Sequence, residues 1–425
     1  MKRIVLLSYL IVLVLSAYVY AGPLEEYVVT GSNDYSWKLT SQTKLPNGVD
    51  AYFLDLYSGT WQGIQWNHRL RVLVPPGQPT GVILFITGSG SGTEELAWFS
   101  EAAVLTGQIA AILHDVPNQP LFGGMREDEL LAFTWLQFLN TGDPTWICHL
   151  PMTNAAARAM DAVDEFILER LGRQPNGYMV CGASKRGWTT WLVAAVDERV
   201  IGIAPMVYDN LNIPAQMAHQ VAVWGDFSYK IGDYTSLGLH EVLGTPMGQA
   251  LVDIVDPYAY REKITMPKLL FMGSNDPYWA VDAVHHYLYD LVGDTYLYYV
   301  ANGGHDLGGD PRVIIPTLVA FCRNVFQGDL PLPQLTWEVT EDGNEIYFQV
   351  QADQPVKAAR FWLALSPFKD FRTATWTSVD AREINYNQVQ HKFLKFKDPL
   401  AVYGELVFET PLGSYSLCTP VYVFE

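Results

Sequence analysis

The chain is poor in cysteine and in basic residues. Its four cysteines, Cys148, Cys181, Cys322 and Cys418, are spread over 425 residues. They are too few and too scattered for the disulfide framework of a small secreted domain. Lysine and arginine number 27 against 45 aspartates and glutamates, and the formal net charge is -18. This charge argues against nucleic acid and anionic membrane as partners.

Glycosylation sites and metal-ligand patterns are also missing. The sequence contains no Asn-x-Ser/Thr sequon, which favours a bacterial exported protein over a eukaryotic secreted one. His219 and His240 have no partner at ligand spacing. The neighbours His285 and His286 would point in different directions on a helix. We therefore expect neither a catalytic metal nor another cofactor.

One long apolar run is present, at the start of the chain. Lys2 and Arg3 precede the run at residues 4–15, and the segment Val19-Tyr20-Ala21 follows, with a small residue last, before Gly22. This order is typical of a secretory signal peptide, which we place at residues 1–21. The run is short for a membrane-spanning helix, although an uncleaved anchor is the alternative reading. No later segment is as long, so we expect a soluble mature chain, secreted or periplasmic.

The length favours two domains. Within residues 22–330, an antiparallel strand pair at 51–57 and 66–74 precedes a regular alternation of strands and helices. The expected strands are 81–86, 109–113, 178–181, 200–207, 268–272 and 295–300, and the expected helices are 94–105, 127–139, 153–171, 188–196, 281–291 and 313–325. This alternation predicts an α/β fold with a doubly wound, mostly parallel sheet.

Two segments depart from the alternation. Residues 210–264 are rich in aromatics and show no strand pattern, which indicates a helical insertion over the sheet edge. Beyond the boundary near residue 330, residues 331–425 show short strands between turns, at 335–339, 345–350, 358–365, 375–379, 400–409 and 417–424. This pattern predicts a small C-terminal β-sandwich, which could contact a surface or a partner.

A serine lies at the junction between an expected buried strand and a helix. Ser184 follows Gly182 and Ala183, whose small side chains allow a tight turn. The layout is that of a nucleophile elbow, which exposes a serine hydroxyl above the sheet of an α/β-hydrolase. The usual motif has glycine two residues after the serine. Here that position holds Arg186, and the glycine comes one residue later, at Gly187.

An acid and a histidine follow the serine in the order that such a fold requires. Asp276 comes after the strand at 268–272, and His305 after the strand at 295–300. Ligands bind beyond the carboxyl ends of strands in open α/β sheets. The sequence therefore predicts a triad of Ser184, His305 and Asp276. Asp209, after the strand at 200–207, is the alternative acid.

The oxyanion of an acyl transfer needs fixed hydrogen-bond donors. We expect one from the backbone amide of Lys185 and another from the glycine-rich turn at Gly88 and Ser89. Lys185 and Arg186 place two cations beside the nucleophile. Arg186 is the candidate substrate contact, and a structural ion pair is the other interpretation of these cations.

Several segments resemble a known family. They are 116–121 (VPNQPL), 150–152 (LPM), 158–161 (RAMD) and above all 182–192 (GASKRGWTTWL). They are similar to the PhoPQ-activated pathogenicity-related proteins, a family of predicted α/β-hydrolases. The resemblance implies that the nucleophile, acid and histidine of the family map to Ser184, Asp276 and His305. The sequence is also similar to glucuronoyl esterases, because those enzymes too have a basic residue directly after the serine. They often take their acid from the strand end where Asp209 falls.

These observations predict an exported serine hydrolase that cleaves an ester or amide through an acyl-enzyme. The substrate would be a small ester, an amide or a peptide. An aminopeptidase or dipeptidyl-peptidase-like enzyme is one alternative, because Glu127, Asp128 and Glu129 could bind a free amino terminus. They are equally explained as the acidic first turn of a helix. The other alternative is a non-catalytic binding or signalling protein on a hydrolase scaffold.

Overall fold

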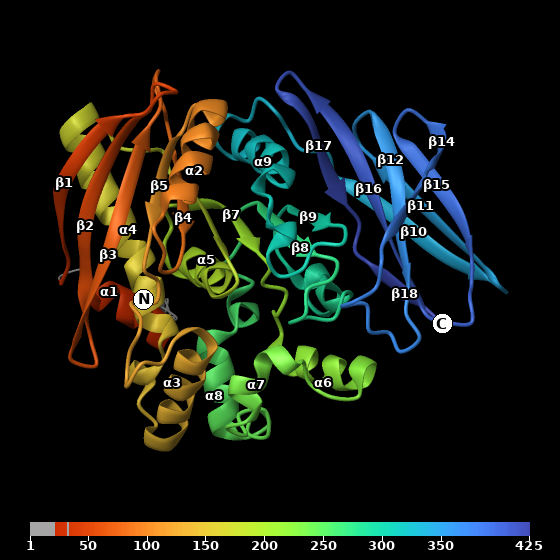
Figure 1. The fold of residues 1–425 in the computed structure, drawn as a ribbon, viewed down its shortest axis with the longest axis horizontal. Coiled ribbons are helices and arrows are strands. Elements are labelled where there is room, and N and C mark those ends of the chain that lie inside the picture. The colour runs from red at the N-terminus through yellow and green to blue at the C-terminus, as the bar shows by residue number, and fades with distance from the viewer. Residues whose placement is uncertain (1–21, 32–33) are drawn as a thin grey trace, which may run out of the picture.

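A computed structural model describes residues 22–31 and 34–425 of the chain (Figure 1). A large mixed sheet runs through the molecule, and a four-stranded sheet packs at its C-terminal end. The predicted signal peptide, residues 1–21, lies outside the described residues. Within the part that is described, no helix has the length and apolar character needed to cross a membrane.

The large sheet has a parallel centre between antiparallel flanks. From β5 through β4, β6, β7 and β8 to β9, neighbouring strands run parallel. On one side, β3, β2 and β1 continue the sheet in antiparallel pairs. These strands are β1 (Ser36–Lys44), β2 (Asp50–Trp61), β3 (Ile64–Val74), β4 (Val82–Ile86), β5 (Ile109–Leu113), β6 (Tyr178–Ala183), β7 (Val200–Met206), β8 (Lys268–Gly273) and β9 (Thr295–Val300).

Two groups of helices cover the parallel strands. α1, α4 and α5 contact one another, α2 and α9 contact one another, and both groups pack on the sheet. The central strands are therefore buried almost throughout, which explains their uninterrupted apolar sequences. The predicted doubly wound α/β fold is confirmed. The main helices are α1 (Pro23–Gly31), α2 (Thr93–Thr106), α3 (Glu127–Thr141), α4 (His149–Leu171), α5 (Lys185–Val196) and α9 (Ile315–Gln327).

Residues 210–264 form the expected helical insertion. It contains α6 (Ile213–Trp224), α7 (Gly232–Thr235) and α8 (Pro246–Val255), with short 3-10 turns before α7 and after α8. In Figure 1 these helices lie with α3 below the sheet, and α3 contacts both α7 and α8. Together they cover one end of the sheet.

The helix predicted at residues 281–291 is wrong. The chain forms two separate 3-10 turns there, Ala283–His286 and Leu288–Asp290. Side chains of the insertion occupy backbone carbonyls that a continuous helix would use: Gln216 donates to the Ala283 oxygen at 2.9 Å and Asn212 to the His286 oxygen at 3.1 Å. The apolar spacing of this segment reflects burial against α6.

The C-terminal residues form a β-sandwich, as predicted, but one of its sheets belongs to the large sheet. β17 pairs with β9 through Cys418 and Leu297, so the large sheet continues into the sandwich. The four-stranded sheet packs across it, with the rings of Phe348 and Phe361 5.1 Å apart. The first sheet contains β12 (Ala358–Leu365), β13 (Thr377–Asp380), β16 (Leu400–Thr410), β17 (Gly413–Cys418) and β18 (Tyr422–Phe424), and the second β10 (Leu335–Asp342), β11 (Glu345–Ala352), β14 (Arg382–Asn385) and β15 (Gln388–Leu394).

Three strands were not predicted from the sequence. β1, β14 and β15 carry mostly polar or exposed side chains, so they lack the apolar signal of a buried strand. The domain boundary near residue 330 stays a prediction. All four cysteines are buried and free.

Candidate active site

Ser184 lies on a tight turn between β6 and α5. Its φ and ψ are 57° and -123°, a conformation that costs energy for any residue other than glycine. The turn is held from both sides, because the Ser184 amide donates to the Met206 oxygen at 2.8 Å and the Trp188 amide donates to the Ser184 oxygen at 3.0 Å. This is the strained geometry of a nucleophile elbow.

The glycines around Ser184 are required by close backbone contacts. A Cβ on Gly182 would lie 2.7 Å from the Arg186 carbonyl oxygen. A Cβ on Gly187 would lie 2.9 Å from the Met206 oxygen and 3.1 Å from the Gly182 oxygen. The displaced glycine therefore lies where α5 meets the ends of β6 and β7.

The structure brings the three predicted triad residues together. The Ser184 Oγ lies 2.8 Å from the His305 Nε2, and the His305 Nδ1 lies 2.7 Å from the Asp276 Oδ2. The other Asp276 oxygen accepts from the Tyr278 amide at 2.9 Å. The ring of Tyr278 packs on the imidazole with centroids 4.2 Å apart. Both the carboxylate and the imidazole plane are thus fixed.

The alternative acid lies in a different environment. Asp209 is buried, and its Oδ1 accepts from the Tyr287 hydroxyl at 2.6 Å. Burial raises the pKa of this carboxyl to about 7, and the nearby charges of Asp276 and Asp282 add to the effect. The carboxylate that contacts His305 is that of Asp276.

The expected oxyanion donors lie on two segments near Ser184. Lys185 is the first residue of α5, whose amino-terminal amides are not used by the helix. Gly88 follows β4, where a Cβ would lie 2.5 Å from the Arg186 guanidinium. Ser89 is exposed beside it. Both segments end at the same edge of the sheet.

The two cations beside Ser184 are paired with acids from the start of α3. The Lys185 Nζ contacts an Asp128 oxygen at 2.8 Å, and the Arg186 guanidinium contacts both Glu127 oxygens at 2.7 and 2.8 Å. Arg186 also donates to the Val116 carbonyl at 2.5 Å. Burial opposes ionisation of Glu127, but Arg186 and Lys185 outweigh it and lower the pKa to about 2. Arg186, the candidate substrate contact, is thus bound within the protein.

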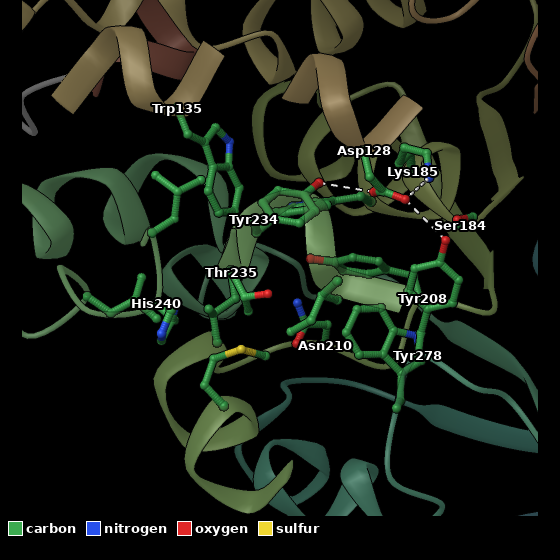
Figure 2. A pocket seen from close by; sticks show the side chains of 17 residues that line it. Asp128, Trp135, Ser184, Lys185, Tyr208, Asn210, Tyr234, Thr235, His240 and Tyr278 are labelled. Atoms are coloured by element: carbon green, nitrogen blue, oxygen red, sulfur yellow. Dashed lines mark hydrogen bonds and ion pairs between the residues drawn. The ribbon is translucent and has the colours of Figure 1, made fainter. Parts of the chain in front are cut away.

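A pocket opens beside Ser184 and encloses about 660 Å³, part of which is open to solvent (Figure 2). In this view it extends from Ser184 and Lys185 to His240, with Asn210 between them. Its wall is mainly apolar and aromatic, and most of it comes from α3, α5 and the insertion. Asp128, which the sequence offered as a contact for a free amino terminus, is part of the lining. The lining residues to which the sequence gave no role in a pocket are Trp135, Trp188, Tyr208, Asn210, Ile213, Met217, Ile231, Thr235, Leu239, His240, Leu243, Tyr278 and Trp279.

One earlier signal points to this wall. The aromatic residues of 210–264 include Trp224, Phe227, Tyr229 and Tyr234, and of these four Tyr234 lines the pocket. The remaining lining residues lie far apart in the sequence, where no local pattern connects them. Among the described residues there is no group of three or more histidine, cysteine, aspartate or glutamate side chains that could hold a metal ion.

Comparison with known proteins gives both a family and a fold. The family described as PhoPQ-activated pathogenicity-related protein matches residues 24–372. Autocrine proliferation repressor protein A of Dictyostelium discoideum is 35% identical over 355 residues, which cover 78% of this chain and 70% of that protein. An acetyl xylan esterase from Paenibacillus sp. R4 has a similar structure, with a TM-score of 0.50 at 16% identity, over 71% of this chain and 93% of the esterase. That likeness shows the fold alone.

Proposed function

The chain belongs to the PhoPQ-activated pathogenicity-related protein family, and from this premise we propose that it is an exported serine hydrolase acting on an ester or amide. The observation that carries the proposal is the continuous hydrogen-bonded line from Ser184 through His305 to Asp276. This arrangement activates a hydroxyl as a nucleophile. A strained backbone at the serine supports it.

In the proposed reaction, His305 takes the Ser184 proton as the hydroxyl attacks the substrate carbonyl. Asp276 holds the imidazole in the correct orientation and stabilises its charged form. The amides of Lys185 and of Gly88 or Ser89 bind the oxyanion. His305 then gives its proton to the leaving group, and water repeats the sequence on the acyl-enzyme to release the acid.

The charges near the pocket favour an ester over a peptide that is bound by its amino terminus. Such a peptidase needs an unpaired carboxylate to bind the ammonium group. Glu127 and Asp128 are already paired with Arg186 and Lys185, and Asp128 also accepts from Tyr234 and Tyr278 hydroxyls at 3.1 Å. We expect free and N-acetylated dipeptide anilides to react equally slowly. A strong preference for the free terminus would favour the peptidase.

Labelling with a fluorophosphonate tests the nucleophile. The wild-type protein should label and should hydrolyse p-nitrophenyl esters. Ser184→Ala should abolish both, whereas Ser236→Ala, on the exposed surface, should change neither. Equal labelling of wild type and Ser184→Ala would show that another residue reacts.

A second candidate is a secreted signalling protein. The name of the Dictyostelium relative describes an autocrine repressor of proliferation, and the C-terminal sandwich offers a surface for contact with a partner. The two candidates differ in their dependence on Ser184. If Ser184→Ala keeps the full biological effect of the purified protein while losing ester hydrolysis, the signalling function does not use the triad.

The proposal that the protein is exported rests on the predicted signal peptide at residues 1–21. The small residue Ala21 suits cleavage before Gly22. Intact mass measurement of the protein recovered outside the cytoplasm should give a chain that begins at Gly22. A mass that includes residues 1–21 would favour the uncleaved anchor.

A further inference from the structure

The pocket beside Ser184 is built largely from aromatic rings in contact with one another. Trp188 stacks on Tyr208 with centroids 4.9 Å apart and meets Trp135 edge to face at 5.7 Å. Tyr234 packs on Trp135 at 5.0 Å, and Trp279 meets Tyr208 at 6.1 Å. Flat apolar groups bind well to such surfaces, because aromatic pairs gain energy beyond the area they bury. The wall therefore suits an aromatic ring.

The ionic groups at the pocket mouth already have partners. Lys185 is paired with Asp128 at 2.8 Å, and Asp128 accepts two tyrosine hydroxyls as well. A charged substrate group entering this apolar space would lose its hydration without gaining an unpaired counter-ion. The pocket thus favours an uncharged group.

Three polar atoms in the wall have no hydrogen-bond partner. They are the Nδ1 of His240, at the end of the pocket away from Ser184, and the hydroxyl oxygen of Tyr208 and the Oδ1 of Asn210, on residues that are 5% and 6% exposed. Buried polar atoms are normally paired, because an unpaired one keeps the cost of its lost hydration. Tyr208 and Asn210 both line the pocket nearer to Ser184, and Figure 2 shows Asn210 at its centre. A bound substrate can supply the missing partner.

The backbone before Tyr208 is strained. Val207 has a φ of 46°, which is a rare conformation for a β-branched residue. Its amide donates to the Phe271 oxygen at 2.8 Å, so the strand ladder holds it there. Such strain persists where the surrounding structure imposes it, commonly next to a functional side chain. Here it turns the chain from β7 into the segment that carries Tyr208 and Asn210.

We propose that this pocket binds an uncharged aromatic group of the substrate that carries a hydroxyl, and that Tyr208 and Asn210 bind the hydroxyl. A hydroxyl both donates and accepts, so it can pair with a tyrosine hydroxyl and with either end of an asparagine amide. The inference rests on the proposed hydrolase function, because the pocket begins at Ser184. It assigns the substrate class to esters of hydroxyaryl acids or of hydroxyaryl alcohols.

Matched ester pairs test the proposal. On the acid side, p-nitrophenyl 3-(4-hydroxyphenyl)propanoate is compared with its unsubstituted phenylpropanoate. On the alcohol side, 4-hydroxyphenethyl acetate is compared with phenethyl acetate. One pair should show a kcat/KM ratio of about tenfold or more in favour of the hydroxyl, because the unsubstituted ester leaves the buried polar atoms unpaired.

Two variants and a control assign the effect to the two residues. Tyr208→Phe and Asn210→Leu should each bring the ratio close to one, mainly by slowing the hydroxylated ester. Tyr234→Phe is the control, because its hydroxyl already donates to Asp128. It should keep the wild-type ratio whatever it does to the rate. Circular dichroism shows whether either variant is misfolded. If one is, the kcat/KM ratio of the other variant is the test.

The outcomes separate this proposal from the one it rests on. Ratios near one for both pairs in a wild-type enzyme that hydrolyses the esters would overturn the substrate class alone. A wild-type ratio that survives both variants would overturn the roles of Tyr208 and Asn210. A protein that neither labels with fluorophosphonate nor hydrolyses any ester would overturn the hydrolase function itself.

Discussion

Gly187 lies three residues after Ser184 because the first turn of α5 packs there against the backbone at the ends of β6 and β7. In the usual elbow motif the second glycine is two residues after the serine, whereas here Arg186 takes that position and projects toward Glu127. The close contact with the end of β7 then falls on residue 187. The shifted glycine and the buried ion pair are therefore two parts of one local arrangement.

Gly187→Ala tests this arrangement. In an exposed helix, alanine in place of glycine would stabilise by about 1 kcal/mol. Here its Cβ would lie 2.9 Å from the Met206 oxygen, and overpacking against backbone costs about 1–3 kcal/mol. We expect a net loss of stability together with lower esterase activity, measured by urea unfolding and by ester hydrolysis. Gly244→Ala, whose Cβ meets nothing within 4 Å, should change neither.

Paired asparagine substitutions separate the two candidate acids. Asp276→Asn should lower kcat by roughly a hundredfold to ten-thousandfold, because the amide cannot hold His305 in the required tautomer. Asp209→Asn should stay within about tenfold of wild type, since this side chain contacts Tyr287. Steady-state hydrolysis of one p-nitrophenyl ester suffices. The opposite ranking would make Asp209 the triad acid.

The ionisation of Asp209 leads to a prediction of how the stability of the fold depends on pH. Its pKa is about 7 in the folded chain, chiefly because of burial, against about 3.9 in an unfolded chain. The folded state therefore binds the proton more tightly, and the stability from this group falls as pH rises from about 4 through 7. Asp209→Asn removes this ionisation. The melting temperature of the variant minus that of wild type should be larger at pH 8 than at pH 5; a constant or smaller difference would contradict the assignment.

At the scale of elements, the loop at residues 366–376 between β12 and β13 contacts both segments that carry the acid and the histidine. Asn275, next to Asp276, donates to the Phe371 oxygen at 3.0 Å and to the Ala374 oxygen at 2.7 Å. Asn302, three residues before His305, exchanges hydrogen bonds of 2.8 and 3.0 Å with the Trp376 backbone. The sandwich thus positions part of the candidate triad.

Asn302→Gly should lower kcat about tenfold or more with little change in KM, because small displacements of a reacting group slow catalysis strongly. Glycine keeps the left-handed backbone, since Asn302 has a φ of 59°. The substitution therefore removes only the side-chain bonds to the loop. Asn344→Ala, in the exposed turn between β10 and β11, is the control. Wild-type kcat in Asn302→Gly would show that the loop does not position His305.

The elements that the sequence predicted well are the strands buried on both faces of the sheet. β5 and β8 are buried at every residue and β4 at all but Phe85, so their apolar runs are unambiguous. Strand order also predicted that Ser184, Asp276 and His305 would meet. The ion partners of Lys185 and Arg186 could not be predicted, because they lie 57 and 59 residues away. The 3-10 turns after residue 281 depend on side chains of α6, which leave no local signal.

At the scale of the whole molecule, the sheet passes from the α/β part into the sandwich through β9 and β17. β9 lies before the boundary that the sequence predicts near residue 330, and β17 lies after it. We expect calorimetry to show one cooperative unfolding transition for the full chain. Two separate transitions would show that the sandwich folds on its own. A chain ending at residue 330 would expose the edge of β9, and we expect it to aggregate.

The four buried, free cysteines have a consequence for the redox conditions in which the chain can fold. Burial raises the pKa of the thiols of Cys148 and Cys181, so little reactive thiolate forms. Folding then needs neither an oxidant nor a disulfide isomerase. Material made in a reducing cytoplasm and material made in an oxidising compartment should be the same protein, because folding does not depend on the redox conditions around the chain.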